Sequence, residues 1–483
     1  PGPRSLATMA AVAMNFNAEL LNGKRIAIPI PLDMTIRELK EELKDFQPSI
    51  DETAKMLSAV DIIIEGKQLN DLEARVSKTI PTVGVHVQVV FSMPPPILCI
   101  MKELAGCKVE DLRDVRVPFP QRRIPTSGFE GCHALLRVDI ADSVTQLGNF
   151  AFRDCSSLRE VTIEGATQIS IGAFCGCSSL TALTIPGSVT RIGHAAFRGC
   201  SSLASLVIPA TVMSIGNDAF ADCRSLRSLA IPDTVIGIGD GIFDGCSSLT
   251  NLNIPRGVTT IGKRACIGCS SLTRLAIPPS VTEIGESAFA SCSSLRSLSI
   301  PESVISIGRN AFAGCRSLTF LDIPNGVTEI RDGTFDGCSS LMTLSIPASV
   351  AQIGQGAFVR CSSLTNLTIP ESVTCVKDCA FDSCSSLRIL TFLPGLMSIG
   401  NYAFAGCSSL TRLDIPYSVT EIGEGAFDGC SSLTSLTIPE TVRKIGPCAF
   451  DGCISLTNLQ LPRPFGAADA SGAVQHDRCD VRF

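Results

Sequence analysis

The sequence of 483 residues contains no Trp, only two Tyr and only four His. His is the side chain most often used for acid–base work near neutral pH. No Ser-His-Asp or Cys-His constellation can be assembled around the four His. No Walker-type or dinucleotide-binding glycine motif occurs either, because the glycines recur at fixed spacing. These absences exclude the common catalytic designs, and we expect neither an enzyme nor a cofactor.

Charge and long apolar runs are also scarce. Charged residues make up 18% of the chain, the net charge is −6, and Lys and Arg are scattered singly or in adjacent pairs. Nucleic-acid binding usually requires a basic stripe, so we expect no nucleic-acid partner. The most apolar window, 83–101, is interrupted by His86, Gln88 and three prolines. It falls short of the roughly 18 apolar residues that a membrane helix needs, and we expect no membrane insertion.

The sequence does contain a 23-residue segment that is repeated along most of the chain. Fifteen copies begin at Cys132, Cys155, Cys177, Cys200, Cys223, Cys246, Cys269, Cys292, Cys315, Cys338, Cys361, Cys384, Cys407, Cys430 and Cys453. Positions within a copy are counted here as residues after this cysteine. One step, from Cys155 to Cys177, is 22 residues. We place this one-residue difference in repeat length around Ile171 and Gly172, and we expect a local kink there.

Each copy has apolar residues at positions 0, 3, 6, 8, 12, 15 and 20, and fourteen of the 23 Phe stand at position 20. Positions 6 and 8 alternate as in a short strand, which the Pro at position 9 ends. The segment around Ala-Phe-x-Gly-Cys is expected to form a short helical turn. One copy cannot bury seven apolar side chains, whereas stacked copies can.

The pattern LxxLxIPxxVxxIGxxAFxxC resembles the BspA-type leucine-rich repeats. This resemblance implies a curved solenoid with parallel strands on its concave face. It also implies a recognition protein, often at a cell surface, and not an enzyme.

The first part of the chain has a different pattern. Its order of strand, strand, helix, strand, strand suggests a small β-grasp domain over residues 14–93. The expected elements are strands at Asn15–Leu21 and Arg25–Ile30, a helix from Thr35, and strands at Ile62–Ile64 and Val83–Phe91.

This segment resembles ubiquitin in its Leu-Asn-Gly-Lys turn at 21–24, in Asp-Met-Thr-Ile at 33–36 and in Glu-Gly-Lys-Gln-Leu at 65–69. Instead of a Gly-Gly tail, the chain continues into three prolines, so the resemblance implies a built-in domain. Leu21 and Ile63 match two positions of ubiquitin's recognition patch, and the third falls on Gln88. Ubiquitin-pathway proteins are therefore candidate partners.

The expected fold class is an α+β ubiquitin-like domain followed by a β-rich leucine-rich-repeat solenoid with short helical turns. A Pro-rich linker at 94–108 connects the two. The solenoid covers 109–462, with a degenerate capping turn at 109–131, and 463–483 form a loose tail.

The cysteines could indicate disulfides or a metal. We interpret the fifteen repeat cysteines as buried free thiols, because an odd number cannot pair throughout, and this favours a reducing compartment. Cys375, Cys379 and Cys384 lie close in sequence, but the chain contains no two Cys-x-x-Cys motifs that could pair as in a zinc site. We therefore expect no metal site.

The candidate binding site is the exposed side of the strands, at positions 5 and 7. Its candidate residues are Arg137, Asp139, Glu160, Arg274, Phe320, Asp322, Ile389, Arg412 and Asp414. Either this is a solvated face that varies neutrally, or Phe320 and Ile389 anchor a protein partner while the arginines set specificity.

Two functional hypotheses remain open. The first is a cytoplasmic scaffold or adaptor that binds an unidentified protein on the solenoid. The alternative is a secreted or cell-surface recognition protein of the BspA type. Arg4 followed by the apolar stretch 6–14 resembles a short signal-peptide core. A signal peptide upstream of Pro1, or glycosylation at Asn366, would favour the alternative.

Overall fold

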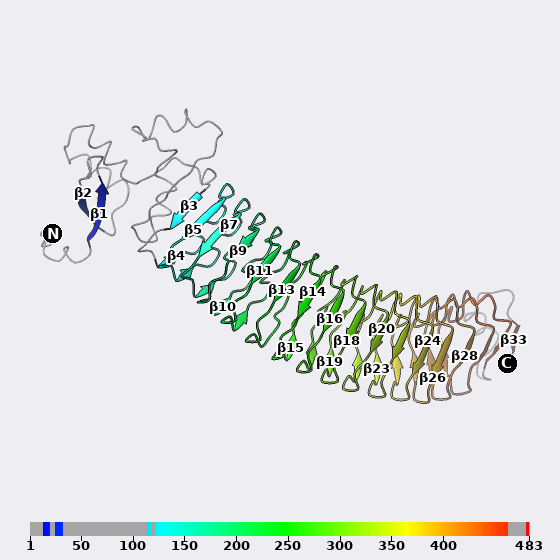
Figure 1. The fold of residues 1–483 in the computed structure, drawn as a ribbon. Helices are drawn as coiled ribbons and strands as arrows, with labels where there is room; N and C mark the ends of the chain where they lie inside the picture. The colour runs from blue at the N-terminus through cyan, green and yellow to red at the C-terminus, as the bar shows by residue number, and fades with distance from the viewer. Residues whose placement is uncertain (1–12, 20–24, 32–113, 118–121, 462–479, 483) are drawn as a thin grey trace, which may run out of the picture.

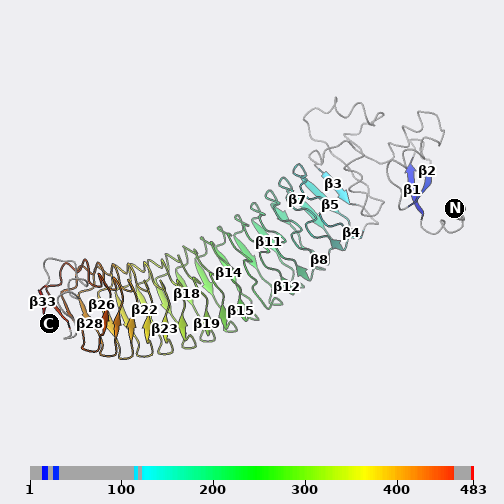
Figure 2. The same cartoon turned by 180° about the vertical axis from the view of Figure 1, so that it is seen from behind.

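The computed structural model describes residues 13–19, 25–31, 114–117, 122–461 and 480–482. From residue 114 onward the chain winds into a curved parallel β-solenoid of about 14 turns (Figure 1). Most turns contribute two short strands, which stack with those of neighbouring turns into two bands along the bend (Figures 1 and 2).

The band of longer strands is called the first ladder. Its strands are β3 (Asp114–Val117), β5 (Arg137–Ile140), β7 (Glu160–Ile163), β9 (Ala182–Leu183), β11 (Ser205–Val207), β13 (Ser228–Ala230), β14 (Asn251–Asn253), β16 (Arg274–Ala276), β18 (Ser297–Ser299), β20 (Phe320–Asp322), β22 (Thr343–Ser345), β24 (Asn366–Ile369), β26 (Ile389–Phe392), β28 (Arg412–Asp414), β30 (Ser435–Thr437) and β32 (Asn458–Gln460).

The second ladder consists of two-residue strands. They are β4 (Arg123–Ile124), β6 (Gln146–Leu147), β8 (Gln168–Ile169), β10 (Arg191–Ile192), β12 (Ser214–Ile215), β15 (Thr260–Ile261), β17 (Glu283–Ile284), β19 (Ser306–Ile307), β21 (Glu329–Ile330), β23 (Gln352–Ile353), β25 (Cys375–Val376), β27 (Ser398–Ile399), β29 (Glu421–Ile422) and β31 (Lys444–Ile445).

Register follows directly from the repeat length. Arg274 pairs with Ser297 and Leu275 with Leu298, so each residue lies beside the residue 23 positions later. In the first ladder, positions 5 and 7 are exposed while position 6 is buried, as period-2 alternation requires. The structure therefore confirms that the chain is a stacked β-solenoid.

The core is one continuous apolar cluster from Val115 to Leu461. The Phe at position 20 stack face to face through successive turns, with ring centroids 5.0 to 5.8 Å apart in all pairs of neighbouring turns that both carry this Phe. Offset stacking of this kind contributes about 0.5–1.5 kcal/mol per pair beyond burial. Cys266 replaces one Phe, so the stack is interrupted between Phe243 and Phe289.

The expected fold class is wrong in two respects. The first is the helical turn: the described residues contain no helix. Asn310 (φ 54°) and Gly314 (φ 73°) adopt the left-handed conformation four residues apart, which prevents a right-handed helix. The Phe312 N–H donates to the Thr334 carbonyl of the next turn, at 2.9 Å. Every second backbone N–H of this segment thus donates to a carbonyl of the next turn of the solenoid. In a helix, these N–H groups would donate to carbonyls of the same segment.

The second correction concerns the front of the chain, because an α+β ubiquitin-like domain is not what the structure shows. Strands β1 (Ala13–Glu19) and β2 (Arg25–Pro31) form an antiparallel hairpin in which Glu19 pairs with Arg25. The expected helix and the two later strands lie outside the described residues, as do Leu21 and Ile63.

The second ladder continues through the short repeat near Gly172, where we expect a local kink. Ile169 is buried and takes position 15, whereas Ile171 is 39% exposed. Gln168 pairs with Arg191 of the next turn, and Gln146 with Gln168, so the second ladder continues. The missing residue therefore lies earlier than we aligned it. At Gly165 an added Cβ would collide with the Asp142 carbonyl, which explains a glycine in this shortened loop.

Residues near the end of the chain extend the first ladder. Strand β33 (Asp480–Arg482) pairs in parallel with β32, and Val481 lies opposite Leu459. The edge of β32 is thereby covered by the chain's own backbone, which satisfies amide groups that an open edge would leave unpaired.

Close approach between turns explains the recurring glycine at position 16. A Cβ built on Gly308 would lie 2.5 Å from the backbone nitrogen of Glu286 in the preceding turn. We expect Gly308→Ala to lower the free energy of unfolding by about 1–3 kcal/mol, because backbone must shift to admit the methyl group. Thermal and urea unfolding of the full chain measure this.

Gly187→Ala is the matched control, since its added Cβ meets no atom within 4 Å. It should leave stability unchanged or slightly raised. Equal destabilisation by the two substitutions would contradict a steric role for Gly308.

Candidate functional site

The nine candidate residues of the solenoid all lie in the first ladder, and all are exposed. Phe320 and Ile389 are 51% and 59% exposed. The structure does not gather the nine residues into one cluster, because they are spread from β5 to β28. That this face lies inside the bend stays a prediction.

Four of the candidate residues form two ion pairs with each other. The Arg137 Nε lies 3.2 Å from a carboxylate oxygen of Glu160, one turn away. The Arg412 Nε lies 3.5 Å from a carboxylate oxygen of Asp414 in the same strand. Such exposed pairs contribute little stability. Arg274, by contrast, has no ion pair within the described residues.

Position 4, just before each strand, was missed by the sequence interpretation. It is often Thr, whose hydroxyl donates to the carbonyl of position 4 one turn earlier, as from Thr250 to Arg227 at 3.1 Å. The other residues in this column are Leu136, Arg159, Ala204, Arg227, Arg296, Met342 and Arg388, and all of them except Leu136 are exposed. The recurring Thr was the signal that could have revealed this column, because these residues depart from it.

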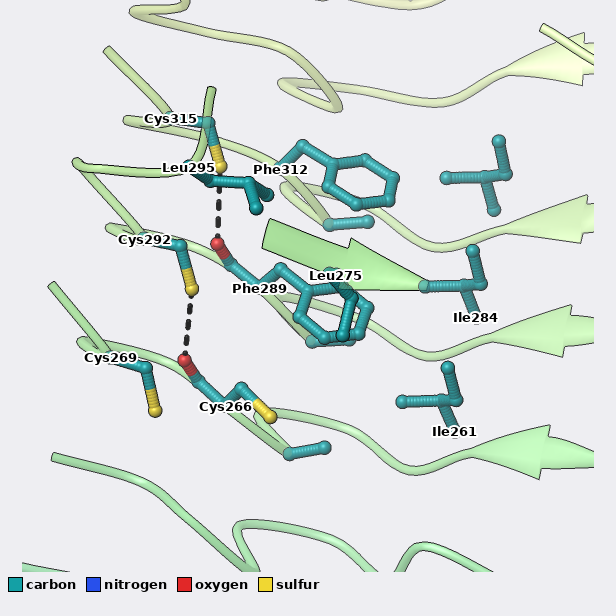
Figure 3. Packing of buried hydrophobic residues seen from close by; sticks show 14 of the residues in the cluster. Ile261, Cys266, Cys269, Leu275, Ile284, Phe289, Cys292, Leu295, Phe312 and Cys315 are labelled. Carbon is teal, nitrogen blue, oxygen red and sulfur yellow. Dashed lines mark hydrogen bonds between the residues drawn. The ribbon is translucent and has the colours of Figure 1, made fainter. Parts of the chain in front are cut away.

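The cysteine ladder was the other candidate for chemistry. Each thiol from Cys155 onward donates to the position-20 carbonyl of the preceding turn, as from Cys315 to Phe289 at 3.4 Å (Figure 3). Cys292 bonds to the carbonyl of Cys266 at 3.3 Å, so this chain of contacts continues where the ring stack is interrupted. The thiols are free and buried. They are packing groups with a hydrogen bond each.

Burial also determines the protonation of these thiols. It raises the pKa of Cys338 and of Cys384 to about 12. A thiol that holds its proton at neutral pH is a poor nucleophile and a poor metal ligand. Among the described residues, no group of three or more His, Cys, Asp or Glu is arranged to hold a metal ion. Cys384 belongs to the buried ladder, whereas Cys375 and Cys379 are half-buried.

In the part of the chain that the structure describes, no helix has the length and apolar character to cross a bilayer.

The geometry defines a leucine-rich-repeat solenoid whose strands carry exposed residues that change from turn to turn. The family model "BspA type Leucine rich repeat region (6 copies)" matches residues 105–227, 167–296, 282–407 and 351–468. The chain therefore belongs to the BspA-type leucine-rich-repeat family. Proteins of this repeat class are typically binding scaffolds without enzymatic activity.

Solved structures are similar as well. A leucine-rich repeat protein from Bacteroides ovatus is 27% identical, with a TM-score of 0.62, over 84% of this chain and 96% of that one. A leucine rich cell surface protein from Faecalibacterium prausnitzii is 29% identical, with a TM-score of 0.45, over 64% of this chain and 90% of that one. No curated protein matches the chain significantly.

The thiol ladder leads us to expect stability that falls at alkaline pH. Unfolding returns each thiol to its ordinary pKa of about 8.5. Between that pH and about 12, the unfolded chain loses protons that Cys338 and Cys384 keep when folded. Stability therefore falls as pH rises, by up to about 1.4 kcal/mol per pH unit for each such thiol.

Urea unfolding of the full chain between pH 7 and 10, with reductant present, measures this slope. A variant with Cys338→Ala and Cys384→Ala should be less stable at pH 7 but lose less stability between pH 8.5 and 10. An identical slope in both proteins would show that the thiols do not cause the alkaline loss.

Proposed function

We propose that this protein is an exported or cell-surface recognition scaffold that binds a protein partner on the exposed face of its first ladder. The observation that carries the proposal is the contrast between core and face. Buried columns repeat one residue type through the solenoid, whereas positions 5 and 7 change from turn to turn and position 4 departs from its recurring Thr in several turns. A surface that varies on a rigid scaffold is suited to specific recognition.

The exposed apolar residues support a protein partner. Phe320, Met342 and Ile389 each leave half or more of their side chain in water. Large apolar and Arg side chains dominate the energetics of protein interfaces. Membership of the BspA-type family supports recognition as the activity.

The cysteines no longer favour the cytoplasm. Their thiols are buried and hydrogen-bonded, and burial raises the pKa of Cys384, so the folded ladder resists oxidation. The family resemblance then gives the extracellular setting more support than the cytoplasmic adaptor.

Photo-crosslinking tests the binding face. A photoreactive amino acid at Thr343, in β22, should crosslink the partner, and the same group at Thr260, in the second ladder, should not. Both residues are exposed and both lie in strands. Phe320→Ala with Ile389→Ala should abolish the crosslink from position 343. Equal crosslinking from both positions, or no effect of the double substitution, would place binding elsewhere.

Location is tested separately. A membrane-impermeant amine reagent applied to intact producing cells should label the protein, or the protein should be recovered from the medium. An abundant cytoplasmic protein serves as the control for lysis. Recovery only after lysis, without labelling, would support the cytoplasmic alternative.

A further inference from the structure

One stretch of the first ladder, from β16 to β28, combines exposed apolar side chains with unpaired positive charge. Phe320 is 51% exposed, Met342 in the next turn 55%, and Ile389 59%. Thr343 pairs with Phe320 across the ladder, and Met342 immediately precedes Thr343 at the start of β22. Phe320 and Met342 are therefore neighbours on this face, and Ile389 lies three turns from Phe320.

The exposed strand positions of this stretch carry a net positive charge, whereas the whole chain has a net negative charge. At positions 4, 5 and 7 it carries four arginines, Arg274, Arg296, Arg388 and Arg412, but only two carboxylates, Asp322 and Asp414. Asp414 is already paired with Arg412. Within the described residues the other three arginines have no ion pair. The whole chain has a net charge of −6.

The ladder is also irregular at this place. Strands β20 and β22 form a two-stranded unit between two larger sheets. Leu344 in β22 is only partly buried, whereas the equivalent Leu321 and Leu367 in the neighbouring turns are buried.

We propose that this stretch binds an extended acidic polypeptide segment. Its apolar side chains contact Phe320 with Met342 at one point and Ile389 at the other, and its carboxylates pair with Arg274, Arg296 and Arg388. Arg–carboxylate hydrogen bonds are charge-assisted and directional, which suits guanidinium groups that lack an internal partner. This inference rests on the proposed function and names the chemistry of the partner.

Spacing constrains the segment. Three steps of about 4.8 Å separate Phe320 from Ile389, a distance of roughly 14 Å along the ladder. An extended chain rises about 3.4 Å per residue, so it covers that distance in roughly four residues. The segment therefore has two apolar residues four positions apart, with Asp or Glu beyond the one at Phe320 to meet Arg274 and Arg296, and another beside the one at Ile389 to meet Arg388.

The probe is a fluorescent synthetic peptide of about nine residues with this pattern, titrated with the full chain and followed by anisotropy. We expect saturable binding that weakens by about tenfold or more between roughly 50 mM and 500 mM salt. A peptide with Lys in place of each acidic residue should not bind. Absence of saturable binding by the acidic peptide would overturn the proposal.

Variants locate the binding. Arg274→Glu with Arg388→Glu should weaken it by about tenfold or more, and Phe320→Ala by about tenfold. Arg191→Glu with Arg443→Glu makes the same change in net charge at exposed residues off this face and should have no effect. Ile236→Ala, at a residue 71% exposed outside the first ladder, is the apolar control. Equal loss in the variants and their controls would overturn the assigned face.

Two further outcomes would replace the acidic segment by another occupant. Displacement of the peptide by an equally charged oligothymidylate at the same concentration would assign the site to phosphates. Self-association of the full chain in sedimentation, lost on Arg274→Glu with Arg388→Glu, would assign it to a second copy. Crosslinking from position 343 that depends on Phe320 and Ile389, without peptide binding, would leave the scaffold function standing and reject only this partner chemistry.

Discussion

The structure depends on one constraint: each buried residue must pack against its own counterpart 23 residues away. Phe tolerates this through stacked rings, and Ile and Leu through dispersion contacts. A charged residue in such a column would face a like charge in the next turn. Accordingly, Thr334 is the one polar side chain that is buried among the described residues, and its hydroxyl donates to the Arg331 carbonyl at 2.7 Å.

The same constraint governs polar groups at the margin of the core. The Ser303 hydroxyl donates to the Val281 carbonyl at 2.7 Å, and the Gln355 backbone N–H donates to the Asp332 carboxylate at 3.0 Å. A small hydroxyl or carboxylate at a fixed position thus satisfies the backbone of the neighbouring turn. The cysteine thiol acts in this way too, because its partner is a backbone carbonyl and not the ring of Phe. This is why a Cys in place of Phe at position 266 leaves the thiol contacts intact.

Self-packing also explains how much the sequence could predict. The buried columns, the strands and their register follow from a strict period, and the exposure of Phe320 and Ile389 follows from alternation with Leu321 and Leu390. The turn around Phe312 could not be read in this way, because half of its amides bond to the next turn, which only stacking brings near. The error over Ile171 has a similar origin: pairing, and not spacing alone, assigns position 15 to Ile169. Met342 and Arg296 were overlooked because position 4 belongs to no alternating strand.

A consequence for recognition follows from what self-packing leaves free. Buried columns are bound to repeat, so partner-specific information must lie in exposed columns, where adjacent turns can differ. Those columns advance one turn, about 4.8 Å, at a time. Information is therefore arranged along the solenoid axis and not along any one strand. A partner that reads Arg274, Phe320 and Ile389 together must extend along that axis, and no single loop of ordinary width would contact all three.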